Sequence, residues 1–376
     1  MFKKYIPLTL SVCLTLTTLT SHAEEWDKQN DPSNMSQRFT YNFNALPLSG
    51  KLSEDKTPWQ STYWPTKFGS IAYRWQQFTW ENPNQKKKFP HYFDVTPPSL
   101  SQLRAMTQAQ INLLSPAEKF DIYLGKYDYP LTKSFLKRKN KYVNAEYWAG
   151  ICDAWSAASI YHAEPLGVTI TNKDGIVIPF TSNDVKALMS FAYKVTPVKG
   201  YGRSGRAGEY RFFKNQSQDL NPGSFHIALA SSIGLMNQSI IMELDPTKEI
   251  WNYPIYKYES VVLEKNIPVT KDSAKAAVTR YKMQTRIYYP SDDEALTPQA
   301  NPTVGTANYE DDWTQYTYFL EIDAYGRIVG GEWIEELNSD NETNSKRHPD
   351  FMWKRDKITY FGNGFEALND LYKPSR

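Results

Sequence analysis

The chain has 376 residues and a formal net charge of +2, from 43 Lys and Arg residues and 41 Asp and Glu residues. Because the two signs are mixed along the sequence, no stretch is basic enough to predict nucleic-acid binding, and we exclude that class. Aromatic residues make up 15% of the chain, with 26 tyrosines, and there are 23 prolines. This composition is typical of exported, loop-rich proteins that bury wide aromatic cores or bind polymers.

Residues 1–23 have the pattern of a secretory signal peptide. Lys3 and Lys4 precede an apolar run, and Ser21, His22 and Ala23 resemble a cleavage site. The run is short for a membrane anchor, so we expect no anchor after cleavage. The mature protein is then predicted to be secreted or periplasmic. About 350 residues remain, which suits one large domain or two modest ones.

Residues 24–96 are predicted to form an extended, aromatic-rich N-terminal segment. From Phe39 to Trp75 the aromatics alternate with turn residues. This pattern predicts irregular structure laid over another part of the fold. Either a pro-segment masking a cleft or a wrap that belongs to the core would account for it, and the tryptophans favour the core. Residues 97–376 are predicted to form the catalytic domain.

Local signals predict the elements of the middle of the chain. Ser115 to Glu118 is a capping box with proline at the first helical position, and Gly125 can end that helix. Next comes the helix expected from Cys152 to about Tyr161. A hairpin is expected from residues 168–171 and 176–179, turning at 172–175, and a second capped helix at 182–193.

The remainder is predicted to be mostly strand. Residues 200–205 match the letters of a dinucleotide fingerprint but lack its strand and helix context, so we interpret them as a flexible loop. Strands are expected at 278–289, 315–322 and 327–334, with a long acidic surface loop at 290–312.

Cys152 is the candidate nucleophile. The other cysteine, Cys13, lies in the signal peptide, so the exported chain keeps a single thiol without a disulfide partner. The sequence around Cys152 predicts a helix start, where the helix dipole lowers a thiol pKa and favours the reactive thiolate. Tyr147, Trp148 and Trp155 are candidates to line a substrate and oxyanion pocket. The alternative is a buried structural cysteine among core aromatics.

A nucleophilic cysteine needs a base, and His226 has the most suitable context. His162 is ten residues after Cys152 on the same predicted helix, which places it about 15 Å along the axis. His226 precedes an apolar stretch, 227–230, that we interpret as a strand; a second strand is expected at 239–245. If the two form a hairpin, Asp245 lies opposite His226 and orients its ring. His91 and His348 are the alternatives.

Several longer motifs resemble the transglutaminase elicitor family, known from secreted oomycete proteins and with many bacterial members. They are Tyr147–Ser159, Asn221–His226, Ile250–Pro254, Gly330–Trp333 and His348–Trp353. The resemblance runs from about residue 40 to 355 and assigns the family's cysteine to Cys152. It implies cysteine acyl transfer on a fold related to papain-like peptidases. Asp153 departs from the family pattern, in which histidine is common at that position.

Together these observations predict an α+β fold with a papain-like core, in which the nucleophile helix packs on an antiparallel sheet. The predicted activity is that of a transglutaminase, in which the acyl group of a glutamine side-chain amide is transferred to a primary amine, with release of ammonia, to form an isopeptide bond. The partners would be proteins bearing glutamine and lysine, or a small amine. We expect no cofactor, although acidic stretches at 292–294 and 309–312 leave calcium open. The alternatives are a cysteine peptidase or glutamine deamidase, and a non-catalytic aromatic surface for glycans or cell wall.

Overall fold

The computed structural model describes residues 24–75, 93–197, 201–205, 220–244, 249–292, 298, 301–334 and 348–376. The signal peptide, His91 and Asp245 therefore lie outside the described residues. Within them, no helix combines the length and apolar character needed to cross a bilayer.

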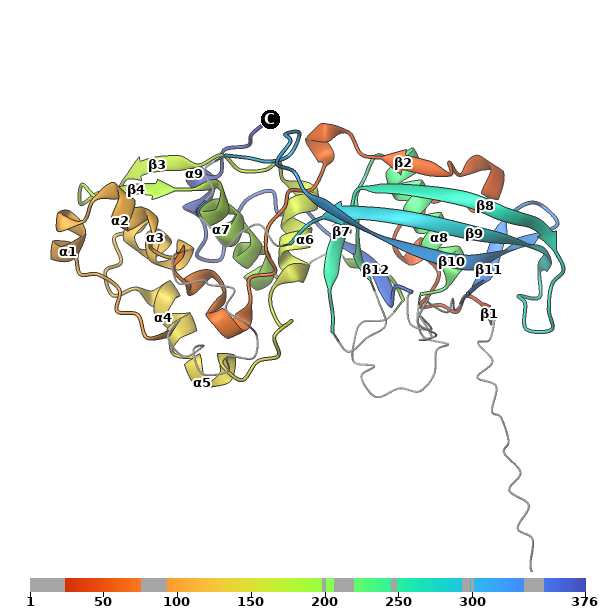
Figure 1. The fold of residues 1–376 in the computed structure, drawn as a ribbon, viewed down its shortest axis with the longest axis horizontal. Helices are drawn as coiled ribbons and strands as arrows, with labels where there is room; N and C mark the ends of the chain where they lie inside the picture. Colours follow the sequence, from red (N-terminus) through yellow and green to blue (C-terminus); the bar gives the residue numbers. More distant parts are fainter. Residues whose placement is uncertain are drawn as a thin grey trace, which may run out of the picture.

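The described residues form two halves with separate hydrophobic cores (Figure 1). One half is mainly helical, and its helices are α1 (Leu100–Ala105), α2 (Gln108–Asn112), α3 (Pro116–Tyr123), α4 (Pro130–Leu136), α5 (Lys139–Tyr142), α6 (Cys152–Tyr161), α7 (Ser182–Val195) and α9 (Leu368–Leu371). This half also holds the hairpin of β3 (Val168–Thr171) and β4 (Val177–Phe180).

The other half is built on a six-stranded antiparallel sheet in the order β1-β11-β10-β9-β8-β2. Its strands are β1 (Glu24–Glu25), β2 (Ser49–Lys51), β8 (Lys257–Ile267), β9 (Ala277–Pro290), β10 (Asp311–Asp323) and β11 (Ile328–Trp333). Helix α8 (Pro222–Leu229) packs on β10 and β11 and continues into a π-helix, Ala230–Leu235.

A four-stranded antiparallel sheet separates the two cores. Its order is β5-β12-β6-β7, formed by β5 (Tyr201–Gly205), β12 (Phe351–Arg355), β6 (Ile240–Glu243) and β7 (Asn252–Ile255). Side chains of a strand alternate between its two faces. Accordingly, Ile241 and Trp353 belong to the helical core, whereas Met242 and Met352 belong to the core of the sheet half.

The aromatic N-terminal residues contribute to both cores. Trp59 and Trp64 are fully buried in the helical core, while Phe39 and Phe43 are buried in the other. The backbone of residues 63–66 also contacts the segment before Cys152. These side chains are therefore structural anchors of the described fold.

Several predicted elements are present with small changes in their bounds. Helix α3 begins at the predicted capping box of Ser115, and α7 begins at a capping box of Thr181. The β3–β4 hairpin turns where Gly175 adopts a φ of +79°. In each case hydrogen bonds between residues close in sequence determine the element.

Three predictions are wrong. The stretch predicted as a strand at 227–230 is helical: residues 227–229 end α8, which starts at Pro222 with Asn221 as its N-cap, and Ala230 begins the π-helix. Residues 201–205 form β5 rather than a loop, because they pair with β12. The interval 290–312 is not wholly a surface loop, because Thr303 and Val304 are buried and donate their N–H groups to Glu164.

Candidate active site

Cys152 begins helix α6, as the sequence predicts, and the helix lies between the two halves of the molecule (Figure 1). The N-cap residue is Ile151, whose side chain cannot accept a hydrogen bond. Among the described residues, the N–H groups of Cys152 and Asp153 have no acceptor. The first turn therefore presents two donors beside the thiol.

The segment before the helix is held by the N-terminal residues. Ile151 donates its N–H to the Tyr63 carbonyl at 2.7 Å, and Thr66 donates to the Ala149 carbonyl at 2.8 Å. Gly150 is required at this crossing, because a Cβ there would lie 2.2 Å from the Tyr63 oxygen. Residues 63–66 thus fix the position from which Cys152 enters the helix.

The sulfur of Cys152 lies against β7 and the residue pair just before it. The thiol donates to the Ile250 carbonyl at 3.6 Å, and the Asn252 Nδ2 group approaches the sulfur at 3.9 Å. Trp353 donates its indole N–H to Asn252 Oδ1 at 2.7 Å, which orients the amide so that its NH₂ faces the sulfur. Glu243, buried in β6, is the cross-strand partner of Asn252.

The sequence-based expectation of a lowered thiol pKa is wrong for this structure. Cys152 is only 6% exposed. Burial, followed by the negative charge of Asp153, raises the pKa of the Cys152 thiol to about 12, against the opposing effects of Asn252 and Lys194. Desolvation of the charged form outweighs the helix dipole here, so the thiol is protonated at neutral pH.

Of the three predicted pocket aromatics, two have side chains that are at least partly exposed to solvent. Tyr147 is 59% exposed and its hydroxyl donates to Glu249, and Trp148 is half-buried. Trp155 is instead fully buried and donates to the Trp59 carbonyl at 3.1 Å, so it anchors the core.

The sequence analysis missed four residues near the thiol as site residues: Tyr63, Glu243, Trp251 and Asn252. The ring of Tyr63 meets that of Trp251 edge-on at 5.0 Å. Trp251 and Asn252 lie in the family-like motif Ile250–Pro254, and that motif was the available signal. Nothing local in the sequence marks Tyr63 or Glu243.

His226 does not lie beside Cys152. It is buried in α8, where its Nδ1 atom is 2.8 Å from the Tyr318 hydroxyl and its ring stacks on Phe43. These partners belong to the core of the sheet half, on the face of the four-stranded sheet away from Cys152. The predicted hairpin between His226 and Asp245 is therefore absent, because residue 226 is helical.

The other described histidines also have core contacts. His162 ends α6 and its Nε2 atom lies 2.9 Å from the Tyr193 hydroxyl. His348 stacks on Trp333 in the sheet half, at 5.7 Å between ring centroids. Burial lowers the pKa of each of the three histidines to about 4, with the charge of Lys357 adding to the shift at His162, so all three are neutral at pH 7.

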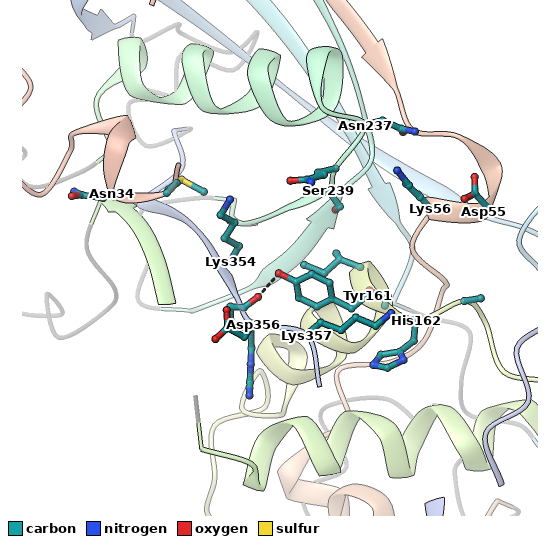
Figure 2. Close-up of a pocket in the computed structure, with 16 residues that line it drawn as sticks. Asn34, Asp55, Lys56, Tyr161, His162, Asn237, Ser239, Lys354, Asp356 and Lys357 are labelled. Atoms are coloured by element: carbon teal, nitrogen blue, oxygen red, sulfur yellow. Dashed lines mark hydrogen bonds between the residues drawn. The ribbon is translucent and has the colours of Figure 1, made fainter. Parts of the chain in front are cut away.

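A cavity of about 690 Å³ lies at the other end of α6 from Cys152 (Figure 2). It is lined by residues 159–163 of α6 and its C-terminal end, by two N-terminal segments and by the end of β12. In the described part of the chain, no group of three or more His, Cys, Asp or Glu side chains is placed to hold a metal ion.

The fold and site define an α+β protein with one buried thiol at a helix start, set between a helical half and an antiparallel-sheet half. The family model described as transglutaminase elicitor matches residues 33–358. The chain therefore belongs to the transglutaminase elicitor family, which confirms the resemblance found in the sequence.

One solved structure shares the fold, the crystal structure of the GP42 transglutaminase from Phytophthora sojae. The TM-score is 0.59 at 19% sequence identity, over 92% of this chain and 96% of that chain. A comparison with curated proteins found no match.

Proposed function

We propose that this protein is a secreted transglutaminase in which Cys152 attacks a glutamine side-chain amide. The observation that carries the proposal is the placement of this thiol at the start of α6, beside the N–H groups of the first turn and the Asn252 amide, in a chain of the transglutaminase elicitor family. Such donors suit a developing oxyanion.

The reaction proceeds in two transfers. The sulfur of Cys152 forms a bond to the amide carbon, the carbon–nitrogen bond breaks and ammonia leaves with a proton from the base. A lysine or small primary amine then attacks the thioester, gives a proton to the same base and releases the thiol, leaving an isopeptide bond. No cofactor takes part.

A protonated thiol needs a base to take its proton. His162, His226 and His348 are each buried among core side chains, so we assign the base to His91, the remaining histidine of the exported chain. Asp245, two residues after Glu243 in the sequence, is assigned the role of orienting the base. His91→Ala tests the base, and Asp245→Ala should lower the rate less, since this residue only orients the ring.

The glutamine must also reach a sulfur that is only 6% exposed. The side chains on its outer side are joined to one another: Tyr63 donates to the Tyr147 carbonyl at 3.0 Å, and Trp251 donates to Glu249 at 3.2 Å. We propose that substrate binding displaces Tyr147 and Trp251 together and exposes the sulfur. The papain-like ancestry and the cleavage of residues 1–23 belong to the same proposal.

Aromatic rings on the outer face of the six-stranded sheet provide evidence against the glycan-binding alternative. These rings already have cations from the same sheet on them: Arg286 lies 4.1 Å from the centre of Trp313, and Lys257 lies 4.0 Å from that of Tyr288. One face of each ring is therefore occupied and unavailable for stacking on a sugar.

The test is incorporation of a fluorescent primary amine into casein by the mature protein. We expect incorporation that is lost in Cys152→Ala, which removes little volume. His91→Ala should lower the rate by at least about a hundredfold, the usual effect of a lost general base. His226→Gln is the matched control and should retain most of the activity.

Ammonia release that is equally fast with and without amine would identify a deamidase instead. Peptide-bond cleavage would identify a peptidase. Full activity in Cys152→Ala would overturn the proposal.

A further inference from the structure

The cavity at the C-terminal end of α6 has a distinct arrangement of charge. It is lined by Lys56 from the N-terminal segment and by Lys354 and Lys357 from the end of β12 and the residues after it. In Figure 2, Lys354 and Lys357 approach the cavity from one side and Lys56 from the other. Within the described residues, none of these three ammonium groups has a carboxylate within 4 Å.

Lys354 is the least exposed to solvent of the three lysines that line the cavity. Its side chain is half-buried, and burial together with the positive charge of Arg38 lowers its pKa. Its ammonium lies 5.8 Å from the centre of the Phe39 ring, a contact that offsets only part of the cost of burying a cation, so an anion bound in the cavity would stabilise it further. The ammonium of Lys357 lies near His162, whose pKa it depresses, so a second positive charge lines the same cavity.

The other residues that line the cavity indicate which chemical groups a ligand would need. Arg355 offers no guanidinium fork to the cavity, because it donates to the carbonyls of Tyr193 and Thr196 at 2.8 and 3.2 Å. Lysines bind phosphate as point charges, whereas a carboxylate favours the bidentate fork of arginine. Asp55 and Asp356 also line the cavity and would accept hydrogen bonds from hydroxyl groups.

We propose that this cavity binds a phosphorylated, hydroxyl-rich small molecule of sugar-phosphate size. The lysines that line the cavity from two segments supply positive charge that attracts the phosphate, and the two carboxylates hold hydroxyls. A volume of about 690 Å³ is in the range of small-molecule sites. Because the walls come from the end of α6, the N-terminal segment and β12, the bound molecule would connect the two halves of the protein.

The experiment is calorimetric titration of the mature Cys152→Ala protein at pH 7 with three matched probes: glucose 6-phosphate, glucuronate and glucose. We expect glucose 6-phosphate to bind most tightly and glucose not to bind. Lys354→Ala/Lys357→Ala should weaken the phosphate probe by at least about tenfold, the size expected for lost charged hydrogen bonds. Lys275→Ala/Lys282→Ala, with the same change in charge on the sheet half, should bind like the parent.

Equal weakening by both double variants would show a general charge effect and overturn the site, as would no binding of the phosphate probe. Glucuronate binding as tightly as glucose 6-phosphate would overturn the preference for phosphate. The Cys152→Ala background makes the result independent of amine transfer, so failure here leaves the proposed enzyme function standing.

Discussion

The two halves of the molecule satisfy their buried polar groups in different ways. In the helical half, the ion pairs Lys119–Asp184 and Lys186–Glu164 are both 2.6 Å long with side chains fully buried. In the sheet half, a neutral chain runs from His226 through the hydroxyls of Tyr318, Thr285 and Ser260. Charge therefore holds distant segments together within the helical half, whereas His226 belongs to an uncharged core.

The ion pairs explain how segments far apart in sequence are joined within the helical half. Trp75 of the N-terminal segment donates to Asp184 at 2.9 Å, and the buried N–H of Thr303 donates to Glu164 at 2.8 Å. A buried charge tolerates few alternative partners. The arrangement thus specifies where the N-terminal segment and the 303–304 stretch join the helical half.

The largest effect is expected from breaking one such pair. Lys186→Met leaves the Glu164 carboxylate buried without its cation, and we expect the free energy of unfolding to fall by about 3–5 kcal/mol in chemical denaturation. In the sheet half, Thr285→Val interrupts the hydroxyl chain and should cost about 1 kcal/mol. A larger loss for Thr285→Val than for Lys186→Met would contradict the contrast between the halves.

Gly150→Ala should have the next largest effect. The added Cβ would lie 2.2 Å from the Tyr63 oxygen, so the segment leading to Cys152 must shift. We expect about 1–3 kcal/mol of destabilisation and a loss of amine transfer greater than the loss of folded protein. Gly362→Ala, where the added atom meets nothing within 4 Å, is the control. Unchanged turnover in Gly150→Ala would show that this crossing does not position the thiol.

Asn252→Ala should act mainly on chemistry. Its amide opposes the rise in the pKa of Cys152, so its removal makes the thiolate harder to form. We expect turnover to fall about tenfold, as for one lost hydrogen bond to a charged group, while circular dichroism stays native-like. Asn252→Gln, which keeps the amide, should recover part of the rate; no difference between the two variants would remove Asn252 from the site.

The smallest effect concerns the pair beside the thiol. Asp153 and Lys194 form a half-exposed ion pair of 2.8 Å, and their charges respectively raise and lower the pKa of Cys152. Since the thiol is protonated below about pH 12, Asp153→Asn should increase the rate of iodoacetamide labelling a few-fold at pH 9, and Lys194→Met should decrease it. The check is the pH–rate profile by mass spectrometry; shifts of opposite sign would refute the electrostatic explanation.

The two halves also differ in how much of their secondary structure could be predicted from the sequence. Helices α3 and α7 and the β3–β4 hairpin are specified by caps, proline and turn residues within a few positions, and α6 by the small, helix-compatible residues after Cys152, so they were predicted. Helix α8 is buried on every side, and an apolar run without an exposed face carries no helical period. Its interpretation as a strand produced the incorrect pairing of His226 with Asp245.

Some residues of the candidate site could be predicted from local sequence signals and others could not. Cys152 could be predicted because it is the one cysteine outside residues 1–23 and begins a helix. Asn252 and Glu243 could not, since they meet only through the pairing of β6 with β7, which brings residue 243 opposite 252. The support from Tyr63 depends on a contact across about ninety residues, for which a single sequence has no local signal.

The most direct test of acyl transfer by Cys152 is to trap the acyl-enzyme. The mature protein would be mixed with a glutamine-containing peptide without any amine, quenched in acid and digested for mass spectrometry. We expect the fragment containing Cys152 to gain the mass of the peptide less ammonia. Added amine should then remove the peptide from the Cys152 thioester. Turnover in the same samples without any adduct on Cys152, or an adduct on another residue, would contradict acyl transfer by Cys152.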